Sequence, residues 1–334
     1  MPGRLRLLLA AAAVAIAGVG TGTVALGLPA RPAAAYYVAL GDSLSQGFQP
    51  MARRGGAGVD TDAGYPDVVQ AALSRAAPAA ARPTLVKLGC PGETTTTMIR
   101  GGICRYAGAD GQLGAAADFL AAHRGRIDLV TLDIGINDVV RCEGRDPSPR
   151  SAACASAGLA ALARDLPVIL ATVHRLAGSA AVIGLNYYDP YAVDAALGGD
   201  GPGRAAWAAQ VTSRLNAALA ATYARFGVPV ADVADSFSPE DPTTLCRLTW
   251  MCSGPPVGQN LHADAAGYRV MASAVEAVEP VALARPVGSV RRLPALGQLA
   301  GGAHPPAVGQ HDQVGQRLPE SGPLHEPGDL VPRP

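Results

Sequence analysis

Five short apolar stretches, separated by longer Ala- and Leu-rich segments, constrain the fold of this chain most strongly. The apolar stretches span residues 37–40, 84–88, 129–134, 181–185 and 228–233. The intervening segments 65–77, 156–177 and 204–226, and a last segment at 265–278, have helical periodicity. Strands that alternate with helices form parallel sheets. The pattern therefore predicts an α/β protein, a three-layer α/β/α sandwich with a five-stranded parallel sheet. Pro167 should kink or split the helix that contains it.

The two ends of the chain lack this alternation. Arg4 and Arg6 precede an apolar stretch and then small residues ending at position 35, which is the layout of a secretory signal peptide over residues 1–35. An uncleaved anchor is the alternative, but the apolar stretch is short for a membrane span of about 20 residues. No later segment is expected to cross a membrane. Residues 285–334 are rich in Pro and Gly without periodicity and predict a disordered tail. Residues 36–284 then form the folded domain.

Charge and composition exclude some functions. The chain has 27 Lys and Arg, 27 Asp and Glu, and 49% hydrophobic residues, which suits one large domain with a core. It has no basic stripe or zinc-finger spacing, so no nucleic-acid partner is expected. The segment Asp60-Thr61-Asp62 lacks the rest of a calcium-binding loop and is interpreted as a solvated turn.

Six cysteines in an exported chain indicate disulfides, which can pair in 15 ways. They form three neighbouring couples, each enclosing a loop rich in Gly, Pro or Arg, and we predict sequential pairing. A metal site is the weaker alternative, because no couple has Cys-x-x-Cys spacing. The couples are Cys90 and Cys104, Cys142 and Cys154, and Cys246 and Cys252.

The residues that follow each predicted strand are candidates for a site, because ligands of open parallel sheets bind beyond the carboxyl ends of the strands. A Ser, a Gly, an Asn, a group of three Tyr and a His occur there. In chain order they are Ser43 in GDSLSQGF, Gly92, Asn137, Tyr187 with Tyr188 and Tyr191, and His262. The tyrosines are suited to line an apolar substrate pocket.

Each of these residues also has a purely structural explanation. A Gly-Asp-Ser segment is common in turns and at helix starts, Gly92 can serve a turn, and Asn137 can cap a helix. A single histidine is more often structural than catalytic. Their joint occurrence, in order at successive strand ends, favours a catalytic site.

These residues resemble the sequence blocks of the SGNH hydrolases, the GDSL esterase and lipase superfamily. Gly41-Asp42-Ser43-Leu44 matches the nucleophile block, Gly92 the second, Gly135-x-Asn137-Asp138 the third, and His262 with Gly267-Tyr268 the last. The resemblance covers about residues 36–283. Within the superfamily, the chain resembles in particular the secreted actinobacterial lipases with three disulfides. It implies a flavodoxin-like fold and carboxylic ester hydrolysis without cofactor or metal.

The resemblance also implies a role for each matching residue. Ser43 would attack the ester carbonyl and His262 would accept its proton. The oxyanion would be bound by the backbone N–H groups of Ser43 and Gly92 and by the side-chain amide of Asn137.

The sequence departs from the family pattern at one position. The family has an Asp three residues before the catalytic His, and this chain has Gln259 there. We expect a main-chain carbonyl near Gln259, or its side-chain oxygen, to orient His262 in a Ser-His dyad. Asp264 is a tempting substitute, but its position at a helix start predicts an N-cap.

The expected protein is a secreted, extracellular, monomeric serine esterase or lipase. Its substrate would be a lipid-like acyl ester, with a carbohydrate O-acetylesterase as the nearest alternative. A non-catalytic binding module on the same fold is a third hypothesis, of which Gln259 would be the first sign.

Overall fold

The structure is a computed structural model of the chain. It describes residues 35–50, 58–143, 147–196, 199–237, 241–254, 257 and 259–284. The chain divides into two units, Met1–Val290 and Arg291–Pro334, and all described residues belong to the first. Apart from residue 35, the predicted signal peptide lies outside the described residues. So does the predicted disordered tail, and both remain predictions.

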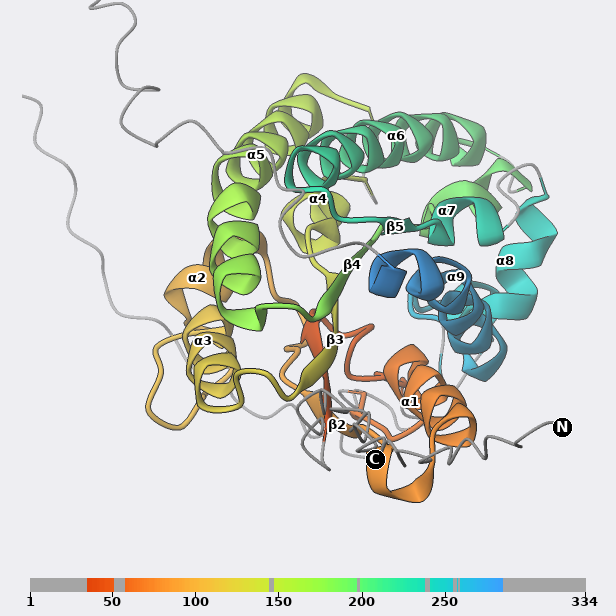
Figure 1. The fold of residues 1–334 in the computed structure, drawn as a ribbon. Coiled ribbons are helices and arrows are strands. Elements are labelled where there is room, and N and C mark those ends of the chain that lie inside the picture. The colour runs from red at the N-terminus through yellow and green to blue at the C-terminus, as the bar shows by residue number, and fades with distance from the viewer. Residues whose placement is uncertain are drawn as a thin grey trace, which may run out of the picture. The chain divides into compact units, whose positions relative to one another are not determined.

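A five-stranded parallel sheet lies at the centre of this unit (Figure 1). Its order is β2-β1-β3-β4-β5, the flavodoxin-like order, and all four strand pairs are parallel. The predicted fold class and the five predicted strands are therefore confirmed. The strands are β1 (Tyr36–Gly41), β2 (Thr84–Lys87), β3 (Ile127–Asp133), β4 (Ala181–Leu185) and β5 (Val230–Ala231).

Helices cover both faces of the sheet (Figure 1). One face carries α1 (Tyr65–Ala76) and α9 (Ala265–Ala284), and the other carries α3 (Gln112–Ala122), α5 (Pro149–Ala177) and α6 (Gly201–Phe226). Shorter helices follow strand ends or fill loops. These are α2 (Thr95–Arg100), α4 (Ile136–Glu143), α7 (Val233–Ser236), α8 (Pro242–Leu248) and the 3₁₀ segments η1 (Ala79–Ala81), η2 (Pro190–Ala196) and η3 (Trp250–Cys252).

The central strands are apolar without interruption because both faces of the sheet are covered. Tyr37, Val38, Ala39 and Leu40 of β1 are completely buried. The Tyr37 hydroxyl, which would otherwise be an unpaired polar group in the core, lies 2.9 Å from the Thr131 hydroxyl on β3.

Two sequence-based expectations concern helix α5, and the structure excludes the splitting of the helix at Pro167 but does not test a kink there. The helix runs for 29 residues and continues through Pro167, so that proline does not split it. It is also long and apolar enough, by length and composition alone, to cross a membrane, which we had expected of no segment after the signal. Part of this apolar composition packs in the core, where Leu162, Leu166 and Ile169 are completely buried.

The three disulfides pair sequentially, as predicted. Cys90 bonds Cys104, Cys142 bonds Cys154, and Cys246 bonds Cys252. The first closes the loop that contains Gly92, the second joins the end of α4 to α5, and the third joins α8 to η3. Each bridge thus constrains a segment next to the carboxyl edge of the sheet.

Candidate active site

Ser43 lies in the tight turn that leaves β1. Gly41 has φ of 140°, and a Cβ atom there would collide with the Asp133 carboxylate, so only glycine fits. The side chain of Gln112 fixes this strand end by accepting from the Gly41 N–H at 2.7 Å and donating to the Gly41 carbonyl at 2.8 Å. Asp42 Oδ1 then accepts from the Leu44 N–H at 2.9 Å, which closes the turn around Ser43.

Two carboxyl groups are completely buried beneath this turn. Asp42 and Asp133 are both 0% exposed. Tyr187 donates to Asp42 Oδ2 at 3.1 Å, and Tyr65 donates to Asp133 Oδ1 at 3.0 Å. Burial raises the pKa of both groups, and the charge of Asp42 raises the pKa of Asp133 further. Burial and like charge thus both disfavour full ionisation of the pair.

His262 reaches Ser43 from the segment that precedes α9. Its Nε2 atom lies 2.8 Å from Ser43 Oγ, within the range of a nucleophile–base hydrogen bond. Its Nδ1 atom lies 2.6 Å from Asn260 Oδ1. The three side chains form a continuous array from serine to histidine to asparagine.

The contacts of Asn260 define the tautomer of His262. Asn260 Oδ1 also accepts from the backbone N–H of His262 at 3.0 Å. A backbone N–H can only donate, so this Asn260 atom is the carbonyl oxygen and Nδ1 of His262 must carry the proton. Nε2 is then unprotonated and accepts from the Ser43 hydroxyl, as a general base requires.

The identity of this histidine partner differs from the sequence-based hypothesis. The side chain of Gln259 is exposed, and the acceptor at Nδ1 is the side chain of Asn260, one residue later. A carboxamide two residues before the histidine is the sequence signal for this contact, whereas the family spacing points to the third residue before it. Asp264 caps α9 as predicted, because its Oδ1 accepts from the N–H groups of Ala266 and Gly267 at 2.8 and 2.9 Å.

Burial depresses the basicity of His262. The Phe48 ring packs against the imidazole with the ring centres 4.5 Å apart. Desolvation lowers the pKa of His262 to about 4, because burial disfavours the charged imidazolium. The imidazole is therefore in its basic form throughout the neutral and mildly acidic range.

Three hydrogen-bond donors near Ser43 have no acceptor among the described residues. The Nδ2 atom of Asn137, in the first turn of α4, is buried and unpaired. Among the described residues, none accepts from the backbone N–H of Ser43 or of Gly92. Gly92 has φ of 83°, a conformation that favours glycine. Unpaired buried donors are costly and call for an explanation such as a ligand.

A side-chain contact connects the segments that carry two of these donors. Asp138 follows Asn137, and Thr95 lies three residues after Gly92. Asp138 accepts from the Thr95 N–H at 2.9 Å and from the Thr95 hydroxyl at 2.7 Å. This bidentate contact fixes the start of α2 relative to the start of α4.

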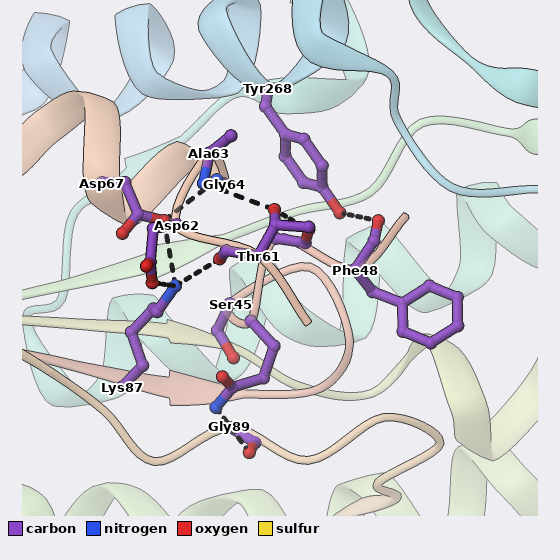
Figure 2. Close-up of polar contacts among 12 residues, drawn as sticks. Ser45, Phe48, Thr61, Asp62, Ala63, Gly64, Asp67, Lys87, Gly89 and Tyr268 are labelled. Carbon is purple, nitrogen blue, oxygen red and sulfur yellow. Dashed lines mark hydrogen bonds and ion pairs between the residues drawn. The ribbon is translucent and has the colours of Figure 1, made fainter. Parts of the chain in front are cut away.

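Figure 2 shows how the loop after Ser43 is held in place. Three side chains donate to carbonyl groups on or beside the loop. One donor belongs to the loop itself, one to the 58–64 segment and one to α9. These contacts are Gln46 Nε2 to Gly89 O at 2.7 Å, Thr61 Oγ1 to Gly47 O at 2.6 Å and Tyr268 Oη to Phe48 O at 2.9 Å.

Lys87 anchors the same region from the end of β2 (Figure 2). Its ammonium donates to the Thr61 carbonyl at 2.6 Å and to Asp67 Oδ2 at 3.1 Å. It also lies 3.5 Å from Asp62, whose side chain is fully exposed. The predicted solvated turn at residues 60–62 is therefore tied to the sheet through its backbone.

Ser43 and His262 open into a partly open pocket with a volume of about 160 Å³. Most of the lining is apolar, and the polar part is the group around Ser43. The lining residues are Asp42, Ser43, Leu44, Phe48, Pro91, Gly92, Ile136, Asn137, Val140, Tyr187, Tyr188, Pro190, Leu261 and His262. The predicted pocket residues Tyr187 and Tyr188 are among them. Tyr191 is not.

No metal site is evident in the described part of the chain. Those residues contain no group of three or more His, Cys, Asp or Glu side chains suited to hold a metal ion.

A serine paired with a histidine that a third residue orients is the geometry by which nucleophilic serine sites are recognised. The chain belongs to the GDSL-like lipase/acylhydrolase family, whose family model matches residues 39–270. No curated protein sequence matches the chain significantly.

The chain is similar to several solved structures, of which the first below has a TM-score above 0.5 and supports the fold. A phospholipase A1 from Streptomyces albidoflavus NA297 has a TM-score of 0.51 and 22% identity, covering 73% of this chain and 99% of that one. An extracellular lipase from Streptomyces rimosus has a TM-score of 0.49 and 22% identity, covering 72% and 99%. An aryl esterase from M. smegmatis has a TM-score of 0.44 and 17% identity, covering 75% and 100%.

Proposed function

We propose that the protein is a serine esterase that hydrolyses carboxylic esters without a cofactor. Ser43 is the nucleophile, His262 the general base and acid, and Asn260 the residue that orients His262. The observation that carries the proposal is the convergence of two features on one pocket. One is the 2.8 Å contact between Ser43 Oγ and a histidine with a defined tautomer, and the other is the unpaired donor of Asn137.

The reaction would proceed through an acyl-enzyme. Ser43 Oγ attacks the ester carbonyl while Nε2 of His262 takes its proton. The negative charge on the carbonyl oxygen is stabilised by the Ser43 and Gly92 N–H groups and by Asn137 Nδ2. As the tetrahedral intermediate collapses, His262 gives the proton to the departing alcohol. Water then attacks the acyl-enzyme with His262 again as base, which releases the acid and restores Ser43.

The unpaired state of the three donors in the free protein supports this role. They pair with no described acceptor, so binding an oxyanion would satisfy groups that are otherwise unpaired. Donors that are already fixed need little reorganisation during the reaction. The backbone of Asn137 is held in α4, and the turn that carries Gly92 is fixed by the contact between Thr95 and Asp138.

We also propose that the protein is exported and acts outside the cell as a monomer. The three disulfides support export, because such bonds persist in oxidising compartments. The N-terminal sequence supports it independently. Mass spectrometry of the protein from culture medium should find a mature N-terminus between residues 26 and 36, and an intact Met1 in secreted protein would contradict cleavage.

Hydrolysis of p-nitrophenyl butyrate by the purified protein tests the proposed activity. The protein should release p-nitrophenol catalytically, and Ser43→Ala and His262→Ala should each reduce kcat at least 1000-fold while the melting temperature changes little. A folded protein without esterase activity, or with undiminished activity in Ser43→Ala, would contradict the proposal and favour a binding module.

A further inference from the structure

The pocket beside Ser43 also restricts the size and chemistry of the substrate. We infer that it takes the acyl part of the ester, and that Val140 limits this part to an uncharged group of about four to six carbon atoms. The inference rests on the proposed function, because it assigns a substrate class to the same site.

The volume of the pocket gives the first argument. An apolar cavity of roughly 150 Å³ is known to accommodate benzene, a molecule of six carbon atoms. The pocket here has about 160 Å³. It therefore has room for more than an acetyl group, whereas a long fatty acyl chain would extend into solvent.

The direction of α4 gives the second argument. Asn137 and Val140 both line the pocket, and they are three residues apart on the same face of α4. A helix rises about 1.5 Å per residue, so Val140 lies roughly 4.5 Å along the helix axis from the proposed oxyanion donor. An acyl chain whose carbonyl oxygen is held by Asn137 would meet Val140 after a few carbon atoms.

The polar groups of the pocket give the third argument. The Tyr187 hydroxyl donates to Asp42 at 3.1 Å, and the Tyr188 hydroxyl donates to the Leu261 carbonyl at 2.7 Å. Among the residues that line the pocket there is no Lys or Arg. Apart from the groups assigned to the reaction, the lining therefore has no cation to pair with a phosphate or a carboxylate, and the protons of its two tyrosine hydroxyls are already used within the protein. Burying such groups unpaired would be costly, so an apolar acyl group fits best.

The side chain of Val140 is suited to set this limit because it is 7% exposed and packed in the core. It takes no part in the proposed chemistry. Its replacement by a smaller residue should enlarge the pocket, and its replacement by a larger one should fill it. Val168, on the outer side of α5 and 47% exposed, provides a matched control for both substitutions.

The test is a chain-length profile of kcat/KM with p-nitrophenyl esters from acetate to decanoate. The unchanged protein should prefer butyrate or hexanoate. Val140→Ala should move the optimum by about two carbons towards longer chains. Val140→Phe should lower kcat/KM for hexanoate at least tenfold while acetate changes less than threefold. Val168→Ala and Val168→Phe should leave the profile unchanged.

Several outcomes would overturn the inference. These are an optimum at acetate or beyond octanoate, or a profile that neither Val140 variant alters. A second series with acetate as the acid and alcohols of increasing size should be insensitive to Val140. Sensitivity in that series alone would assign the pocket to the alcohol. Because all of these outcomes require ester hydrolysis, they are distinct from a failure of the proposed function, in which no ester is hydrolysed.

Discussion

At the scale of single residues, Asn260 distinguishes this site from one with a carboxylate partner. A carboxylate at Nδ1 would both fix the tautomer of His262 and stabilise the imidazolium, whereas the amide oxygen of Asn260 does only the first. The 2.6 Å and 3.0 Å contacts of Asn260 Oδ1 supply the orientation. The low pKa of His262, about 4, is consistent with the missing negative charge.

A pH profile of kcat/KM tests this interpretation. Because the pKa of His262 is lowered, the basic imidazole should persist as the pH falls, and activity should decline only near pH 4 to 5. Asn260→Asp would add a negative charge beside Nδ1 and should raise the acid limb by about one to three pH units. An unmoved limb in Asn260→Asp would show that the group titrating there is not His262.

Removal of the amide should act differently from addition of charge. Asn260→Ala leaves Nδ1 without its acceptor, so the imidazole can take the wrong tautomer, which costs up to about 10⁴-fold in a related triad. We expect kcat to fall more than tenfold with little change in KM. Activity equal to that of the unchanged protein would refute the orienting role.

The unpaired amide of Asn137 leads to a prediction about activity and stability together. Asn137→Ala should lower kcat by about 100- to 1000-fold, the usual loss for one oxyanion donor. It should not lower the melting temperature, since the lost donor has no protein partner. A clear loss of stability with little loss of activity would instead make Asn137 a structural residue.

At the scale of elements, the loop after β1 and the segment before α9 act as one unit. Gln49 connects them, because its Nε2 donates to the Ala263 carbonyl at 3.0 Å and its Oε1 accepts from Trp250 at 2.9 Å. Ser43 and His262 belong to these two segments. We therefore expect their 2.8 Å contact to depend on the hydrogen bonds of Gln49, a residue that takes no part in the proposed reaction.

Loss of the Gln49 hydrogen bonds should reduce the rate without changing the chemistry. Gln49→Ala should lower kcat at least tenfold, because small displacements of reacting groups are costly, while the pH profile keeps its shape. Gln70→Ala is the control. Gln70 likewise has one side-chain and one backbone partner, since it donates to the Ser74 hydroxyl at 3.0 Å and to the Pro83 carbonyl at 3.1 Å, but it lies in α1. Equal kcat in the two variants would contradict the positioning role.

The elements also differ in how far sequence predicted them. The five strands were predictable because parallel strands covered on both faces are continuous apolar stretches. The predicted last strand, 228–233, proved to be only Val230–Ala231, because Asp232 caps α7 by accepting from the Asp235 N–H. Asn260 and Val140 were missed, since contacts of single side chains across segments leave no periodic pattern in the sequence.

At the scale of the whole molecule, the buried pair of Asp42 and Asp133 connects the site to stability. Both are completely buried, and burial raises their pKa values in the native state. Unfolded carboxyls lose their protons at about pH 4. Between that pH and the raised native pKa, the native protein binds more protons than the unfolded chain, so the free energy of unfolding falls as pH rises.

Asp133→Asn should remove part of this dependence. Its amide oxygen can still accept from Tyr65, and the variant has one carboxyl fewer to ionise. The free energy of unfolding of the variant, relative to the unchanged protein, should therefore increase from pH 5 to pH 8 in urea denaturation series. A difference that stays constant or decreases over this range would contradict the raised pKa values of the two carboxyl groups.

If His262 activates Ser43 as a nucleophile, a fluorophosphonate should label the protein, and intact-mass analysis measures this labelling directly. We expect one adduct per molecule, mapped to Ser43, with none in Ser43→Ala and much slower labelling in His262→Ala. Folded protein that remains unlabelled, or that is labelled equally fast without His262, would contradict it.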